Sequence, residues 1–238
     1  MNYIGIDGCK KGWFYIGLDD FNNYSFGIIP IFSECQKLIK KAEIVLVDIP
    51  IGLREIDTKE RLCDLEARKV LGIRRSSVFP PPSRLVLKHT NYGISSKANF
   101  EYTGRQLSKQ SFAIMNKINE VDEFVRSTGT QGKIREMHPE VCFWALNGKR
   151  PMLYNKKKPE GIRERTLLLH QFHSNTEKVI AEAKTNFLRK DVAVDDIIDA
   201  LVGAVTAKNK NNLRTLPINP ESDEKGLKME IVYYLTTS

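Results

Sequence analysis

The stretch Tyr3–Leu18, YIGIDGCKKGWFYIGL, decides the fold class. Its two apolar segments, Tyr3–Asp7 and Trp13–Leu18, each have the length of a β-strand, and the intervening Asp7-Gly8 is typical of a turn. A third strand is predicted at Tyr24–Phe32 (YSFGIIPIF) after a short polar turn. The chain therefore begins with three consecutive strands.

A helix and a buried strand follow. Ser33–Ala42 has its apolar residues on one face and begins with a serine, a residue that often caps helices. Ile44–Val47 (IVLV) is apolar on both faces, as in the central strand of a sheet, and it ends at Asp48. The order strand, strand, strand, helix, strand predicts an α/β fold.

The rest of the chain predicts a single domain of residues 1–238 that contains a helical and proline-rich insertion at about 55–130. Within this insertion we expect an irregular loop at Gly72–Ser96, because Pro80-Pro81-Pro82 prevents regular structure. The other expected elements are helices at Asp57–Leu71, Gln106–Arg126, 161–189 and Val194–Ala207, a helix opening at His138-Pro139, and strands at Lys133–Met137 and Met229–Leu235.

The composition is that of a globular protein, with 41% hydrophobic and 28% charged residues. Its four cysteines form no CxxC pair, which argues against a zinc ribbon or a disulfide framework and favours reduced thiols in the cytoplasm. No apolar run approaches the ~20 residues of a membrane span. The N-terminal apolar stretch contains Asp7 and does not resemble a signal peptide. We therefore expect a cytoplasmic protein without a membrane partner.

The net charge of +8 is concentrated in two turn-rich segments. Arg74–Lys109 contains seven basic residues and one acidic residue, and Lys149–Arg165 contains seven basic and two acidic residues. Such segments can bind a nucleic-acid backbone, or they can simply form a solvated surface.

Three arginines flank the stiff segment SSVFPPP. Arg74, Arg75 and Arg84 are the candidate nucleic-acid-binding residues, because guanidinium groups bind phosphates well. The alternative is that they anchor this loop to Asp64, Glu66 or the body of the protein.

Two aspartates lie where strands end. Asp7 ends the first predicted strand, and Asp48 ends the fourth. In open α/β sheets, ligands bind just outside the carboxyl ends of the strands. Each aspartate can also be explained as a residue that forms a turn.

The helix Val194–Ala207 carries a further acidic group. At ~100° per residue, Asp195, Asp196 and Asp199 share one arc of the helix. The helix N-terminus favours Asp195 or Asp196, but Asp199 lies a turn further in. A cation between these residues would remove their mutual repulsion. The alternative is a solvated acidic face.

Carboxylates from two strand ends and one helix form an all-oxygen site, which suits Mg²⁺ or Mn²⁺ and disfavours zinc. Two such ions can activate a water molecule and stabilise the leaving oxygen of a phosphodiester. We therefore predict a metal-dependent nuclease. Its catalytic and metal-binding residues are Asp7, Asp48, Asp196 and Asp199.

Three further acids are second-tier candidates for this site. Asp195 adjoins the helical pair, and Glu136 ends the predicted fifth strand. Glu140 follows His138-Pro139, where it also suits the first turn of a helix.

This pattern of elements and acids resembles the RNase H-like fold, especially its RuvC-type resolvase branch. The resemblance implies a mixed five-stranded sheet flanked by helices. It also implies that Asp7 bridges two metal ions, that Asp48 holds one, and that Asp196 with Asp199 holds the other. The resolvase branch usually has a glutamate on its fourth strand, where this sequence has Asp48.

Over essentially its full length, the chain is similar to the predicted RNase H-like nucleases of domain-of-unknown-function family 429. Six motifs in order carry this resemblance. They are GIDGCKKGW (Gly5–Trp13), VDIPIGL (Val47–Leu53), RLCDLEARKVLG (Arg61–Gly72), RRSSVFPPPSR (Arg74–Arg84), EMHPEVCFWALNG (Glu136–Gly148) and DDIIDALVGAVTA (Asp195–Ala207).

Two other functions stay open. A non-catalytic module would bind DNA or RNA through its basic surface without using the acids. An actin-like phosphotransferase also begins with a strand ending in Asp-Gly, but it needs a second phosphate-binding hairpin, to which Ser127–Thr130 is the nearest match. We expect no nucleotide cofactor, because the chain has no Walker loop and no GxGxxG motif. A dimer would suit a two-fold junction substrate.

Overall fold

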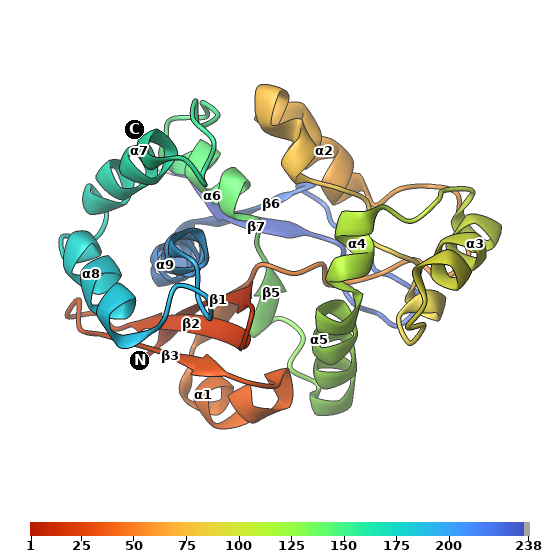
Figure 1. The fold of residues 1–238 in the computed structure, drawn as a ribbon, viewed down its shortest axis with the longest axis horizontal. Helices are drawn as coiled ribbons and strands as arrows, with labels where there is room; N and C mark the ends of the chain where they lie inside the picture. The colour runs from red at the N-terminus through yellow and green to blue at the C-terminus, as the bar shows by residue number, and fades with distance from the viewer. Residues whose placement is uncertain (236–238) are drawn as a thin grey trace.

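The computed structural model describes residues 1–235 and is built around a five-stranded sheet (Figure 1). The sheet order is β3-β2-β1-β4-β5, with β1 to β3 antiparallel and with β4 and β5 parallel to β1. The strands are β1 (Tyr3–Cys9), β2 (Gly12–Leu18), β3 (Tyr24–Ile29), β4 (Ile44–Val47) and β5 (Ile134–Glu136). This mixed sheet confirms the predicted α/β class and is consistent with an RNase H-like fold.

Helices cover both faces of the sheet (Figure 1). On β1, Ile4 and Ile6 belong to the core shared with α5, while Tyr3 and Cys9 belong to the core shared with α9, because successive side chains of a strand point to opposite faces. One face is covered by α1 (Gln36–Lys41) and α5 (Met115–Thr128). The other is covered by α6 (Pro139–Leu146), α7 (Pro159–His170), α8 (Thr176–Asn186) and α9 (Val194–Lys208).

Helix α9 lies unusually close to β1. A Cβ atom on Gly5 would overlap the backbone of Ala200 and Ala204, and one on Gly203 would lie 3.1 Å from the Cα of Gly5. The two glycines therefore let the helix and strand backbones touch, which larger residues would prevent. This contact sets the position of the acidic residues on α9.

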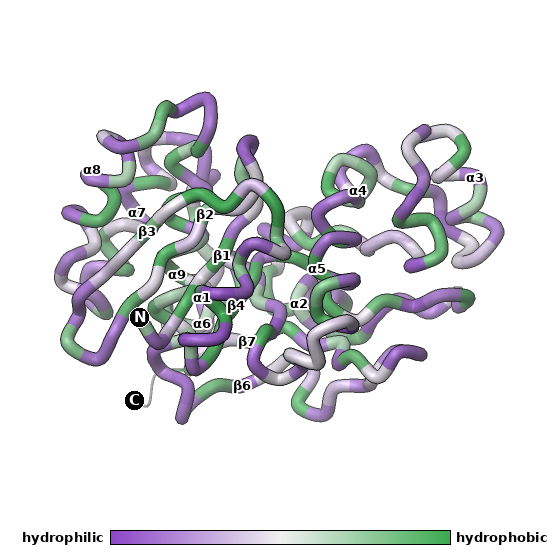
Figure 2. Tube along the Cα trace, turned by 90° about the horizontal axis from the view of Figure 1, so that it is seen from below, coloured by the Kyte–Doolittle hydropathy of each residue, from purple (hydrophilic) through white to green (hydrophobic). Residues whose placement is uncertain are grey.

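The chain between β4 and β5 forms α2 (Leu62–Leu71), α3 (Tyr92–Thr103), α4 (Lys109–Ala113) and α5, with short 3-10 turns at Gly72–Ser77 and Arg84–Val86. In both views of the molecule, α3 lies at the end opposite α8 (Figures 1 and 2). Figure 2 also shows that β1, β4 and α9 are largely hydrophobic, whereas the outer turns are hydrophilic.

A second, two-stranded sheet pairs β6 (Leu213–Leu216) with β7 (Ile231–Tyr234). Val232 of β7 forms a parallel bridge with Met137, just beyond β5, so this hairpin lies next to the edge of the main sheet. No helix among residues 1–235 is long and apolar enough to cross a membrane.

Several elements differ from their predicted bounds. The predicted helix Gln106–Arg126 is divided at Ile114 into α4 and α5, and the helix predicted at Ser33–Ala42 is a 3-10 turn followed by α1. The expected loop Gly72–Ser96 contains two 3-10 turns and the start of α3. The sequence pattern did not predict α3 or β6.

Candidate active site

Three of the predicted acids meet at one point. Asp7, Asp48 and Asp199 each place a carboxylate oxygen within 4.8 Å of the others. Asp7 and Asp48 are neighbours because Ile6 pairs with Val47 and the Asp48 amide donates to the Ile6 carbonyl at 2.9 Å. Asp199 joins them because it lies one turn before Gly203, where α9 contacts β1. The sheet order and one close helix contact thus build the group, which we call the acidic triad.

The protein environment disfavours the charged form of the acidic triad. Burial, followed by the charges of Asp48 and Asp199, raises the pKa of Asp7 well above its usual value. Burial and the nearby carboxylates raise the pKa of Asp48 to about 8, although Lys156 acts in the opposite direction. The pKa of Asp199, which is fully buried, is also raised by burial. A cation bound here would favour the ionised carboxylates.

One such cation belongs to the chain itself. Lys156, in the loop between α6 and α7, donates a hydrogen bond to Oδ2 of Asp199. Burial alone would lower the pKa of Lys156, but Asp199, Asp7 and Asp48 raise it above its ordinary value. Lys156 is therefore positively charged over the physiological pH range.

The acidic triad also fits a divalent metal ion. Oδ1 of Asp199 is buried and has no hydrogen-bond partner among the described residues, and an unpaired buried carboxylate oxygen is costly. One oxygen of Asp7 accepts from the Gly8 amide at 2.7 Å, while its second oxygen accepts no hydrogen bond from the described residues. An all-carboxylate donor set of this kind suits Mg²⁺ or Mn²⁺.

The structure does not bring Asp196 into this group. Its Oδ2 accepts from the Ala193 amide at 2.9 Å, so its side chain caps the start of α9. Burial, with the charges of Asp195 and Asp199, raises the pKa of Asp196 to about 6. Asp195 lies partly exposed on the same turn and is not among the carboxylates that meet. Of the three aspartates on α9, only Asp199, in the second turn of the helix, belongs to the triad.

The two second-tier glutamates bind arginines. Both oxygens of Glu136 accept from Arg61 at 2.8 Å, and Oε2 also accepts from the Ile51 amide at 2.7 Å. This buried ion pair also binds the backbone at Ile51 and Gly52, and so it holds the segment after β4 in place. Glu140 accepts from Arg165 at 2.6 Å through Oε1, while its buried Oε2 has no partner among the described residues. Glu140 thus keeps one free oxygen near the triad.

Asp7 and Asp48 line a cleft of about 670 Å³. The chain between β4 and β5 forms one wall, and the start of α6 and the α6–α7 loop form another. Basic and polar side chains of these walls face the acidic floor. They include Arg74, Ser76, Ser77, Gln110, Lys117, His138, Asn155, Lys156 and Lys157. Phe79 adds an aromatic surface. A polyanion with a cation at its reacting centre would match this charge distribution.

The three predicted phosphate-binding arginines have different positions. Arg74 lines the cleft, and its Nε donates to the Met152 carbonyl at 2.9 Å, which ties the two walls together. Arg75 is exposed beside it. Arg84 is buried, and it lies outside the cleft lining.

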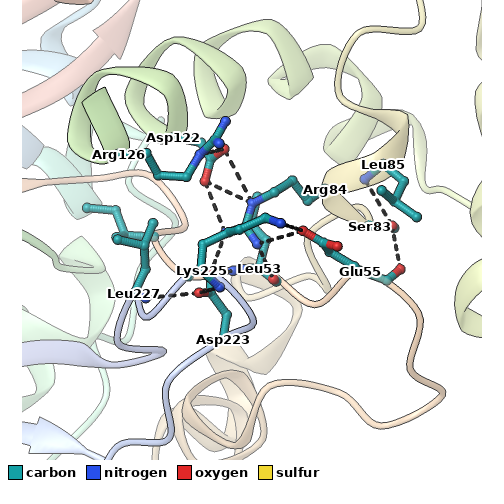
Figure 3. Close-up of polar contacts among 12 residues, drawn as sticks. Leu53, Glu55, Ser83, Arg84, Leu85, Asp122, Arg126, Asp223, Lys225 and Leu227 are labelled. Atoms are coloured by element: carbon teal, nitrogen blue, oxygen red, sulfur yellow. Dashed lines mark hydrogen bonds and ion pairs between the residues drawn. The ribbon is translucent and has the colours of Figure 1, made fainter. Parts of the chain in front are cut away.

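Arg84 is the centre of an ionic cluster (Figure 3). Its guanidinium contacts Asp122 of α5 at 3.1 Å, the Leu53 carbonyl at 3.0 Å, and Asp223. Arg126 also binds Asp122, at 2.9 Å. These contacts correct the predicted role of Arg84 in phosphate binding and favour the alternative in which it anchors the loop, since its donors are already satisfied.

Sequence reasoning missed Lys156 and Lys117 as site residues. The basic segment Lys149–Arg165 indicated the region of Lys156, but no pattern distinguished it from Lys157 or Lys158. Lys117 donates to the Gly12 carbonyl and lies 4.6 Å from the centre of the Trp13 ring. The phosphotransferase hairpin is not found at the cleft, because Ser127 and Thr128 belong to the end of α5 and do not line it.

Comparison with known proteins identifies a family. No curated protein and no solved structure matches the chain significantly. A family model described as "Protein of unknown function (DUF429)" matches residues 5–222. This range includes Asp7, Asp48 and Asp199, and it covers most of the chain. The chain therefore belongs to the DUF429 family.

Proposed function

We propose that this protein is a metal-dependent nuclease that hydrolyses phosphodiester bonds of nucleic acid. The observation that carries this proposal is the convergence of Asp7, Asp48 and Asp199, of which Asp7 and Asp48 line a cleft with basic walls. Lys156 neutralises only one of these buried acids, so the ionised triad would destabilise the fold without a further cation, and a basic wall alone would not need the acids. A metal ion together with a phosphate chain accounts for both features.

The acidic triad would hold Mg²⁺ or Mn²⁺ through carboxylate oxygens. When bound, such an ion polarises the phosphoryl group and lowers the pKa of a water molecule. The contribution of the protein is to keep three anionic oxygens within 4.8 Å of one another on rigid elements. The buried Oδ1 of Asp199 is available for this role because nothing among the described residues binds it.

The cleft walls would bind the nucleic-acid backbone. Arg74, Lys117 and Lys157 line the cleft, and their positive charges can contact phosphates. Ser76 offers a neutral hydroxyl on the same wall. Such contacts fix the position of a strand but select no base sequence, so both DNA and RNA are substrates to test.

His138 lines the cleft as a neutral imidazole. Its Nε2 lies 3.3 Å from the Ser77 carbonyl, a contact that requires the proton on Nε2. Burial lowers the pKa of His138, so the ring is neutral at pH 7. Its Nδ1 then carries a lone pair, and it has no hydrogen-bond partner among the described residues.

An Asp199→Asn variant tests this function. Labelled single-stranded and duplex DNA and RNA are incubated with native protein and Mn²⁺ or Mg²⁺. We expect cleavage by the native protein that EDTA abolishes, and a loss of at least 100-fold in Asp199→Asn, since one missing charge removes several kcal/mol of transition-state stabilisation. Asp195→Asn is the matched control, because it makes the same change on the same helix outside the triad, and it should retain activity.

The same assay distinguishes a nuclease from a non-catalytic nucleic-acid-binding module. Salt-dependent binding of nucleic acid without cleavage under any metal condition would favour a non-catalytic binding module. Equal cleavage by native protein and Asp199→Asn would contradict the proposed site.

A further inference from the structure

We propose that the acidic triad takes one divalent cation per chain, because the ammonium group of Lys156 permanently occupies the position of a second one. This inference rests on the proposed function and departs from the two-ion site that the sequence resemblance implies.

The charges of the site favour a single ion. The acidic triad carries three negative charges when ionised, and Lys156, bound to Oδ2 of Asp199, neutralises one of them. The two remaining negative charges equal the charge of one Mg²⁺ or Mn²⁺. A second divalent ion would leave an excess of positive charge in a largely buried site, because the charge of the neighbouring Glu140 is already paired with Arg165.

The number of carboxylate oxygens that are free to bind a metal also favours a single ion. On Asp199, Oδ2 is bound to Lys156, and only Oδ1 is free. Asp196, the residue expected to complete a second metal site, instead caps α9 through the Ala193 amide. The carboxylates that meet among the described residues therefore provide ligands for one ion.

The segment that carries Lys156 is held in place. The Glu164 carboxylate accepts from the amides of Leu153 and Tyr154 at 2.9 and 3.1 Å, and Arg165 donates to the Tyr154 carbonyl at 3.1 Å. On the other side of Lys156, the Lys158 amide donates to the Asn155 carbonyl at 2.9 Å. These bonds hold the backbone of the loop beside α9, and the ion pair with Asp199 holds the ammonium group, so Lys156 acts as a fixed cation.

Titration calorimetry of Mn²⁺ into metal-stripped protein tests this inference. We expect one bound ion per native chain. Lys156→Gln removes the fixed charge and frees Oδ2 of Asp199, so it should bind two ions or bind the first at least ten-fold more tightly. Lys156→Arg keeps the charge and should bind one ion. Lys158→Gln, the same change at an exposed residue that does not line the cleft, should match the native chain.

Electron paramagnetic resonance of the Mn²⁺-loaded native protein tests the same inference without a variant. When the protein is saturated with Mn²⁺, a spectrum of magnetically isolated Mn²⁺ ions supports the inference. A spectrum of two magnetically coupled Mn²⁺ ions about 3.5–4 Å apart would overturn it. In that case, nuclease activity that depends on Asp199 would still support the proposed function. Native stoichiometry and affinity in Lys156→Gln would also overturn the inference. Absence of Mn²⁺ binding in every protein would reject both the inference and the metal-dependent function.

Discussion

At the residue scale, the buried acids of the triad lower the stability of the metal-free protein when they ionise. Asp48 has a pKa of about 8 in the folded protein, above its usual value of 3.8, and the pKa of Asp7 is raised in the same direction. Folding therefore favours the protonated acids. Their contribution to the free energy of unfolding is fully present below the unfolded-state pKa, and it is lost as the pH rises through the folded-state pKa.

This linkage predicts the pH dependence of the metal-free protein. In EDTA, the melting temperature of the native protein should fall between about pH 5 and pH 8 relative to that of Asp48→Asn, which cannot ionise at this position. Each unit of pKa shift corresponds to about 1.4 kcal/mol, so the two melting curves should separate measurably. Mn²⁺ should raise the melting temperature of the native protein more than that of the variant. Parallel pH profiles would contradict this account.

At the element scale, the site depends on the contact between α9 and β1. Gly5→Ala should destabilise the protein by about 3 kcal/mol or more, because the new methyl group would overlap the backbone of Ala200 and Ala204, which cannot move independently of α9. Gly93→Ala is the control, since Gly93 is exposed in α3 and its nearest neighbour would lie 3.4 Å away. Urea unfolding measures both variants. A loss for Gly5→Ala no larger than that for Gly93→Ala would show that α9 can shift.

The same elements explain what the sequence could predict. The strands β1 and β4 and the helix α9 are strongly apolar, which made them predictable from the sequence. Asp7 and Asp199 lie on two of these elements and Asp48 directly follows the third, so all three acids of the triad could be predicted. Helix α3 was missed because it buries Ser95, Asn99 and Thr103 and exposes apolar residues, which reverses the usual pattern. The role of Lys156 depends on a loop that packs through tertiary hydrogen bonds, for which a single sequence has no signal.

At the scale of the whole molecule, the cleft joins parts of the chain that are far apart in sequence. Its acidic floor comes from the sheet, and its basic walls come from the chain between β4 and β5 and from the α6–α7 loop. The buried cluster around Arg84 joins the 3-10 turn Arg84–Val86 to α5 and to Asp223 near the C-terminal hairpin (Figure 3). Removing one partner of a buried ion pair commonly costs about 3–5 kcal/mol, so Arg84 contributes to the cleft by holding its wall.

Arg75 allows the nucleic-acid interface to be tested separately from the fold. It is exposed between two residues that line the cleft, Arg74 and Ser76. If its guanidinium contacts a phosphate, Arg75→Gln should weaken nucleic-acid binding at low salt and reduce the slope of log K against log salt by about one. Fluorescence anisotropy across a salt series measures both quantities. Arg189→Gln makes the same charge change at an exposed residue outside the cleft lining, so it should leave the slope unchanged. Equal effects of the two variants would mean that net charge alone, and no defined contact at the cleft, recruits the nucleic acid.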